Sequence, residues 1–247
     1  MPTVLAWNLR HGGGSRRMAP IALQLLEHAA DVFILSEFRW RTGGQIAGIL
    51  ADHGWPHQTA TEAPEGQNAL LIASRTPLVG AGGGPSTPGG PALCDHAAAV
   101  GRRMAEVCLP TLGLSLAAVH IPCPGRGLGR GAVFQAVIAA ARRRRSESFL
   151  LMGDFNAGRH RLDEDGTTFA GTRCLGQLAA MGYRDAWRDR HPCATDRSWY
   201  SHAGAGFRID HAMVSAPLAA RVRRCWYSHA ERERGLSDHS AIAIEIE

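Results

Sequence analysis

The run SFLLMGDFNAG (148–158) ends an apolar stretch in a carboxylate and an amide, Asp154 and Asn156, on one short polar segment. A turn would by itself explain the Gly, Asp and Asn residues without any chemistry. The same pair on a tight loop could also offer a carboxylate to a water molecule and an amide to a phosphate group. The other polar residues of the chain decide between these two interpretations.

Acidic, amide and imidazole side chains stand at the ends of most other apolar runs. They are Asn8, Glu37, His120, Asp210 with His211, and Asp238 with His239. Each has an ordinary explanation when taken singly: a turn, a surface ion pair, or a hydrogen-bonded interior histidine. Strand ends gather in space more readily than strand middles do, so their joint occurrence predicts one shared site.

This set of side chains suits metal-assisted hydrolysis of a phosphodiester. Mg²⁺ takes oxygen ligands and keeps several waters, so one or two carboxylates and an amide oxygen suffice, and Glu37 and Asn8 are suitable. The reaction also needs an oriented water and charge stabilisation on the phosphoryl oxygens. Asp210 and His239 would form a dyad in which the carboxylate fixes the imidazole tautomer, while Asp238 could lie on the metal side.

Composition agrees with a globular enzyme that binds a polyanion. Of the 247 residues, 45% are hydrophobic, which is enough for a substantial core, and we expect one domain over residues 1–247. The formal net charge of +5 favours a polyanionic partner such as nucleic acid. The chain contains no lysine, and this absence excludes a Schiff-base lysine, a Walker lysine and a Ser-Lys dyad.

The cysteines and the apolar segments indicate in which cellular compartment the protein acts. The six cysteines are widely spread and form no CxxC pair, so reduced thiols are expected and a zinc ribbon is not. The N-terminal sequence lacks the features of a secretory signal, and no segment approaches the roughly 18 apolar residues of a membrane span. We therefore expect a cytoplasmic monomer that acts away from membranes, and we infer no protein partner.

Strand and helix signals alternate along the chain. Apolar runs indicate strands at 3–9, 31–37, 68–74, 97–109, 114–121, 207–215, 221–229 and 239–247, with Arg102, Arg103 and Glu106 on a wet face of the fourth. Helical spacing covers 18–30, 42–54, 130–145 and 174–182. The segments RHGGG (10–14) and 79–95 are expected to be loops. The pattern favours the α/β class, with mixed strands in two sheets and helices outside.

Six motifs give the chain a family resemblance. WNLR, LSEFR, VHIP, GDFNAG, RIDHAMVS and LSDHSAIA occur in the order and rough spacing of the endonuclease/exonuclease/phosphatase superfamily. The match spans essentially the whole chain, and the last third looks most like the exonuclease III and abasic-site endonuclease branch. The resemblance implies a four-layered α-β-β-α sandwich, with one divalent metal, Mg²⁺ or Mn²⁺, in a cleft at the strand ends.

Carried over by position, the resemblance also implies a role for each motif residue. Glu37 would be the chief metal ligand, Asn8 would lie near the metal and the phosphate, and Asp238 would complete the metal region. The remaining implied roles are the orientation of the attacking water by Asp154, the binding of a phosphoryl oxygen by Asn156, and the orientation of His239 by Asp210.

Substrate specificity rests on fewer residues. Trp199 and Phe207 fall where the abasic endonucleases have aromatic side chains that line a sugar pocket, and core packing is an equally good explanation of both. His120 stands where that branch usually has a tyrosine, and a histidine is more similar to DNase I and sphingomyelinase-type enzymes. Arg10, a candidate substrate contact, follows Asn8 where the branch tends to have an acid. These departures leave specificity for abasic sites open.

Three functions are compatible with these residues. The leading hypothesis is a Mg²⁺- or Mn²⁺-dependent phosphodiesterase that acts on DNA as a nuclease, with His120 among its catalytic residues. The alternative keeps this chemistry but acts on a small phosphate ester or a phospholipid headgroup. The third is a nucleic-acid-binding module that has lost catalysis, although every expected catalytic position carries a competent side chain.

Overall fold

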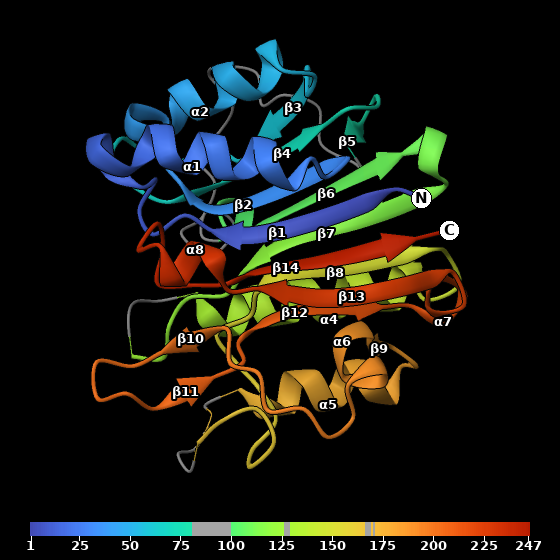
Figure 1. Ribbon diagram of the computed structural model, residues 1–247. Coiled ribbons are helices and arrows are strands. Elements are labelled where there is room, and N and C mark those ends of the chain that lie inside the picture. Colours follow the sequence, from blue (N-terminus) through green and yellow to red (C-terminus); the bar gives the residue numbers. More distant parts are fainter. Residues whose placement is uncertain (81–99, 126–128, 166–168, 170) are drawn as a thin grey trace.

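The computed structural model describes residues 1–80, 100–125, 129–165, 169 and 171–247. Within these ranges the strands form two six-stranded sheets and one two-stranded hairpin, and helices cover both outer faces (Figure 1). The expected α/β class and four-layered arrangement are confirmed.

The first sheet has the order β13-β14-β1-β2-β4-β3. Its β1–β2 pair is parallel and its other pairs are antiparallel, so the sheet is mixed as expected. Its strands are β1 (Thr3–Asn8), β2 (Val32–Phe38), β3 (His57–Ala60), β4 (Ala69–Ser74), β13 (Val222–Ser228) and β14 (Ala241–Ile246).

The second sheet has the order β5-β6-β7-β8-β12-β9, and its one parallel pair is β7–β8. A separate hairpin pairs β10 (Trp199–Tyr200) with β11 (Gly206–Phe207). The strands of the second sheet are β5 (Val79–Gly80), β6 (Met104–Leu109), β7 (Leu114–His120), β8 (Phe149–Asp154), β9 (Arg184–Asp185) and β12 (Asp210–Val214).

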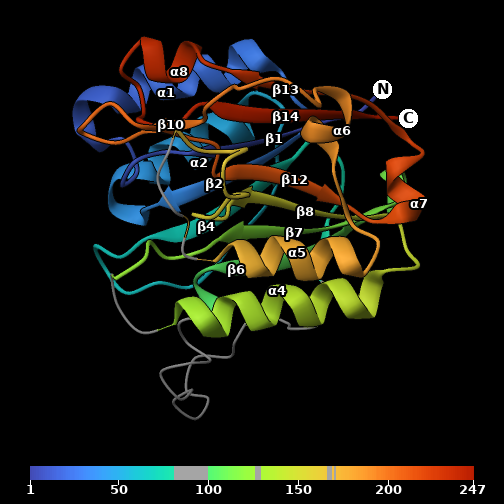
Figure 2. The ribbon, with the colours of Figure 1, turned by 90° about the horizontal axis from the view of Figure 1, so that it is seen from below.

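Helices flank the two sheets on their outer faces (Figures 1 and 2). Helices α1 and α2 lie against the first sheet, and α4 and α5 run side by side on the second. The helices are α1 (Gly14–His28), α2 (Trp40–Asp52), α4 (Arg130–Arg144), α5 (Thr172–Ala180), α6 (Ala186–Arg190), α7 (Ala216–Ala219) and α8 (Ala230–Glu233), with one 3-10 turn at Pro110–Leu112.

Three hydrophobic clusters produce the four layers. Alternate side chains of a strand point to opposite faces, so Val4 and Ala6 enter the core between the sheets, whereas Leu5 and Trp7 pack toward α1 and α2. A third cluster joins the outer face of β7 and β8 to α4 and α5. Because both faces of the central strands are buried, their sequences read as continuous apolar runs.

One expected strand is shorter than its apolar run. Strand β6 begins at Met104; residues 97–99 lie outside the described ranges, and Arg102 and Arg103 form a turn before the strand. The amide of Arg103 donates to Val100 O, and its carbonyl accepts from the amide of His120. We expected Arg103 on a solvent-exposed face of a strand. This expectation is wrong, because a turn directs Arg103 toward the end of β7. Of the expected loop 79–95, Val79 and Gly80 instead form β5, and 81–95 lie outside the described residues.

Candidate active site

Asp154 lies at the centre of a row of three polar residues across the second sheet. Its register partner is His120 in the parallel pair β7–β8 and Asp210 in the antiparallel pair β8–β12. All three side chains are buried. Strand pairing therefore brings together predicted site residues from three distant parts of the sequence.

The GDFN sequence combines a turn with a site, which answers the question raised by its composition. Gly153 has φ +137°, and a Cβ there would lie 2.2 Å from the carbonyl oxygen of Val119. Glycine alone permits this approach. Asn156 also has positive φ (45°), and its amide donates to Oδ1 of Asp154 at 2.8 Å, which closes the turn. The turn holds one oxygen of the Asp154 carboxylate in place.

The second carboxylate oxygen of Asp154 is bound by side-chain amides. Nδ2 of Asn8 donates to Asp154 Oδ2 at 3.0 Å, and Nδ2 of Asn156 donates to the same oxygen at 3.0 Å and to Ile121 O at 2.9 Å. Asn8 comes from β1 of the other sheet, and its own Oδ1 accepts from the amide of Arg10 at 2.9 Å. Asn8 therefore connects the two sheets at the site.

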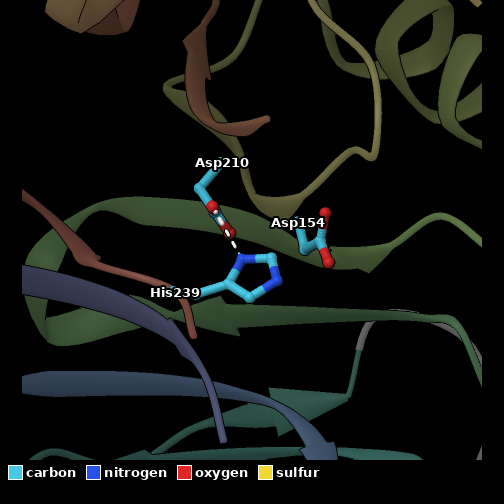
Figure 3. A group of neighbouring side chains, drawn as sticks. All are labelled: Asp154, Asp210 and His239. Carbon is cyan, nitrogen blue, oxygen red and sulfur yellow. Dashed lines mark hydrogen bonds and ion pairs between the residues drawn. The ribbon is translucent and has the colours of Figure 1, made fainter. Parts of the chain in front are cut away.

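Asp210 and His239 form the predicted dyad. Nδ1 of His239 lies 3.0 Å from Oδ2 of Asp210, and both side chains are buried (Figure 3). Asp154 stands beside this pair, and one ligand atom from each of the three residues lies within 4.8 Å of the others. The hydroxyl of Ser237 accepts from the amide of His239 and donates to Asn8 O, which fixes the histidine backbone against β1.

Burial and charge set the protonation of this cluster. Burial, followed by the charge of Asp210, raises the pKa of Asp154 to about 7. Burial opposes a charged imidazole at His239, but the charge and hydrogen bond of Asp210 prevail and raise the pKa of His239 to about 10. Burial and the nearby Arg103 hold the pKa of His120 well below its usual range. Near pH 7, His239 is therefore cationic and His120 is neutral.

Glu37 joins the site from the end of β2 through His120. The Nε2 atom of His120 lies 3.7 Å from Glu37 Oε1 and 3.8 Å from Asp154 Oδ2. Glu37 stands at a register shift in β2 with φ +54°, a conformation that is rare for a residue with a side chain. Its other carboxylate oxygen, Oε2, accepts from the amide of His11 at 2.8 Å. Glu37, His120 and Asp154 are thus neighbours.

The remaining predicted residues form the rim of the site, the more exposed region beside the Asp210–His239 dyad. They are Arg10, Asp238, Trp199 and Phe207. Asp238 is partly exposed; its Oδ2 accepts from Trp199 Nε1 at 3.3 Å, and its Oδ1 lies 3.9 Å from Arg10 Nε. The Trp199 ring packs on Phe207 and on His239, with centroids 5.7 and 6.4 Å apart. Asp238 therefore lies outside the Asp154, Asp210 and His239 group, and the two aromatic residues form a wall next to His239.

Comparison with known proteins places this geometry in a family. A family model described as "Endonuclease/Exonuclease/phosphatase family" matches residues 5–239. The chain belongs to this family. Its membership confirms the resemblance drawn from the six motifs, and no curated protein was found to match the chain.

Solved structures similar to this family member share its fold over their full length. An AP endonuclease from Archaeoglobus fulgidus is 16% identical with a TM-score of 0.79, and all of both chains is covered. A variant of the 3′ phosphatase NExo from Neisseria, bound to a product DNA hairpin, is 20% identical with a TM-score of 0.78 and the same coverage. The 3′-5′ exonuclease NExo from Neisseria meningitidis is 20% identical, with a TM-score of 0.73 and 99% of both chains covered.

Membership in the endonuclease/exonuclease/phosphatase family makes the chain a metal-dependent hydrolase of phosphate esters, and two sets of side chains could hold a divalent metal. Asp154, Asp210 and His239 form one set. In it, Nδ1 of His239 is already bonded to Asp210 and the imidazole is cationic near neutral pH, so a metal would have to displace a proton. Glu37 and the neighbouring Asn8 offer hard oxygen donors, which Mg²⁺ and Mn²⁺ prefer.

Two residues that shape the site were not among the predicted site residues. Nη1 of Arg103 lies 2.8 Å from Nδ1 of His120, and the Ser198 hydroxyl accepts from the amides of Ile209 and Asp210 at 3.0 and 3.2 Å. Neither has a local signal, because arginines are abundant in this chain and Ser198 is a single serine before an aromatic residue.

Membrane spans were a separate question. Among the helices of the described residues, none is both long and apolar enough to cross a membrane.

Proposed function

We propose that the protein is a Mg²⁺- or Mn²⁺-dependent nuclease that hydrolyses phosphodiester bonds of DNA. One observation carries the proposal: Asp154 lies beside the Asp210–His239 dyad on one side and beside His120 on the other, and His120 in turn lies 3.7 Å from Glu37. A buried carboxylate, a cationic imidazole and, through His120, a candidate metal carboxylate thus lie close together. This combination is what attack of water on a phosphoryl group requires.

Glu37 would hold the metal together with Asn8 and Asp238. Asp154, which His120 separates from Glu37, is a further carboxylate near this metal region. The bound metal would supply positive charge to the phosphoryl oxygens and to the departing oxygen. Asn8 and Asp238 also have protein partners, since Asn8 Oδ1 accepts from the amide of Arg10 and Asp238 Oδ2 accepts from Trp199 Nε1.

Asp154 would orient and deprotonate the attacking water. Its raised pKa suits a general base near neutral pH, because such a base must both lose and accept a proton there. His239, kept cationic by Asp210, would donate a hydrogen bond from Nε2 to a phosphoryl oxygen. Asn156 would exchange its bond to Ile121 O for a bond to the phosphate. Arg10, Trp199 and Phe207 would contact the nucleotide beside the scissile bond.

DNA is the substrate that the comparisons and the charge favour. Two of the similar structures are named as a 3′-5′ exonuclease and an AP endonuclease, and a third holds a product DNA hairpin. The net charge of +5 suits a polyanion. Action as a single-domain monomer in the cytoplasm is part of the same proposal.

Hydrolysis of a terminal phosphate monoester is a second candidate. The observation that favours it is the similarity to a protein named as a 3′ phosphatase. The chemistry would be the same: water attacks phosphorus, the bond from phosphorus to the 3′ oxygen of the strand breaks, and inorganic phosphate is released.

A panel of labelled oligonucleotides with Mg²⁺ tests both candidates. It would contain duplex, single-stranded and nicked DNA, an abasic analogue, and a 3′-phosphorylated end, each incubated with wild type and with Asp154→Asn. The proposed nuclease cleaves at least one DNA, more slowly as salt rises, because arginine contacts with the backbone release counterions. Removal of 3′ phosphate alone would favour the second candidate. Wild type that leaves the whole panel intact, or Asp154→Asn with full activity, would refute the proposed site.

A further inference from the structure

A left-handed turn follows β1 and reaches into the active site. Five consecutive residues, Arg10 to Gly14, have φ values of 50, 58, 72, 76 and 67°. The amide of Gly13 donates to Leu9 O at 2.9 Å, which closes the turn. Left-handed backbone is unfavourable for residues with side chains, so Arg10 and His11 adopt it only if surrounding contacts stabilise it.

The strained residues of the turn direct their amides at two predicted metal-side residues. The amide of Arg10 donates to Asn8 Oδ1 at 2.9 Å, and the amide of His11 donates to Glu37 Oε2 at 2.8 Å. The His11 ring also lies 2.8 Å from Oε2 through Nδ1. With Oε2 held in this way, Oε1 of Glu37 is the oxygen that faces His120, at 3.7 Å.

Packing against α2 leaves room for glycine alone at the middle of the turn. A Cβ on Gly12 would lie 2.5 Å from Thr42 Oγ1 and 3.3 Å from Arg39 Cβ. Thr42 Oγ1 is buried, and within the part of the chain that the structure describes it has no hydrogen-bond partner. Gly14 has a similar φ of +67°, but a Cβ on it would meet nothing within 4 Å.

We propose that the turn Arg10–Gly13 positions the metal carboxylate, with Gly12 as the residue that allows the turn to pack against α2. This inference rests on the proposed assignment of the metal to Glu37. Glu37 lies at an irregular point of β2 with positive φ, so its own strand does not hold the side chain in a regular direction. The His11 amide supplies the missing constraint from outside the strand. A solvent loop, which RHGGG suggests, would bind neither Asn8 nor Glu37.

The inference is tested by measuring how tightly the protein of residues 1–247 binds Mn²⁺ in the absence of DNA. Calorimetry or electron paramagnetic resonance gives this affinity. Gly12→Ala is expected to weaken Mn²⁺ binding about tenfold or more, as is typical when a group that orients a ligand is lost. Gly14→Ala is the matched control: it imposes the same positive-φ strain in open space and is expected to bind nearly as wild type. Thr42→Ala added to Gly12→Ala removes the closest clash and is expected to restore most of the affinity.

The outcomes separate this inference from the proposed function. If Glu37→Gln binds Mn²⁺ as wild type does, the metal assignment fails and the positioning role fails with it. If Glu37→Gln loses binding while Gly12→Ala retains it, or if Gly14→Ala weakens binding as much as Gly12→Ala, the positioning role alone is refuted.

A second measurement keeps Gly12 unchanged, and it tests the inference even if Gly12→Ala does not fold. Amide hydrogen exchange at His11 is expected to be faster in Glu37→Ala than in wild type, because the acceptor of that amide is lost. Equal exchange rates in the two proteins would overturn the inference.

Discussion

Asn8 donates a hydrogen bond to Asp154 across the two sheets, from Nδ2 to Oδ2 at 3.0 Å. The donor ends β1 of the first sheet and the acceptor ends β8 of the second. The apolar core between the sheets brings these strand ends together, and the site forms where that core gives way to polar side chains. Stability and chemistry are therefore coupled at Asp154.

The contribution of Asp154 and His239 to the free energy of unfolding should fall as the pH rises from about 4 to 10. The pKa of His239 is about 10 in the folded chain against an ordinary value of 6.5, and the pKa of Asp154 is about 7 against an ordinary value of 3.8. The folded state therefore binds more protons than the unfolded state between these values. The contribution of His239 is complete below about pH 6.5 and is lost as the pH rises through 10; that of Asp154 is lost between about pH 4 and 7. Thermal melts in EDTA measure this trend.

His239→Gln isolates the histidine part of that trend. The variant should lose most of the decline in melting temperature between pH 6.5 and 10 and keep the decline at lower pH. If the melting temperature of this variant declined above pH 7 as steeply as that of wild type, the raised pKa of His239 would be contradicted.

Divalent metal should stabilise the protein more at pH 8 than at pH 5. Protons compete with a cation for carboxylates, and Asp154 retains its proton up to about pH 7. The increase in melting temperature on addition of Mn²⁺ over EDTA, measured at both pH values, checks this, with Ca²⁺ as a comparison cation. Glu37→Gln should abolish most of the increase if Glu37 is the principal ligand.

Ser198→Ala should slow turnover without weakening DNA binding. The Ser198 hydroxyl accepts from the Asp210 amide at 3.2 Å, and its carbonyl accepts from the Ser240 amide at 2.9 Å, so Ser198 contacts the backbone on both sides of the dyad. Loss of a buried acceptor costs about 1–3 kcal/mol, and we expect kcat to fall about tenfold with KM nearly unchanged. Ser201→Ala is the matched control, because Ser201 follows β10 as Ser198 precedes it, and its hydroxyl likewise accepts from a backbone amide, that of Ala205. Equal effects of the two changes would count against a role in positioning the dyad.

Arg103→Gln should raise the pKa of His120. Burial is the largest cause of its low pKa and Arg103 the next, so removal of the guanidinium relieves part of the depression. The shift is measurable by NMR titration of the imidazole, with Arg102→Gln as the neighbouring control. An unchanged His120 titration would show that the contact between Arg103 and His120 has no electrostatic effect.

Much of the fold could be predicted from the sequence because its signals are local. The apolar runs of β1, β2, β4, β7 and β14 and the helical spacing of α1, α2, α4 and α5 depend on neighbours along the chain. Strands β3, β5 and β9 lack such a signal, since each is short or has no continuous apolar run. The strand expected from residue 97 was too long, because apolar composition does not mark where a turn diverts Arg102 and Arg103.

The sequence by itself determined which chemical groups are available: the carboxylates, amides and imidazoles at the strand ends, and the family they indicate. Only the tertiary structure decided how they pair, because hydrogen bonding requires side chains to meet at about 3 Å across strands that are far apart in sequence. It paired Asp210 with His239, placed Asp154 between His120 and Asp210, and set Asp238 at the rim. It also folded RHGGG into a left-handed turn against Glu37, since that conformation depends on the space left by Thr42 in α2.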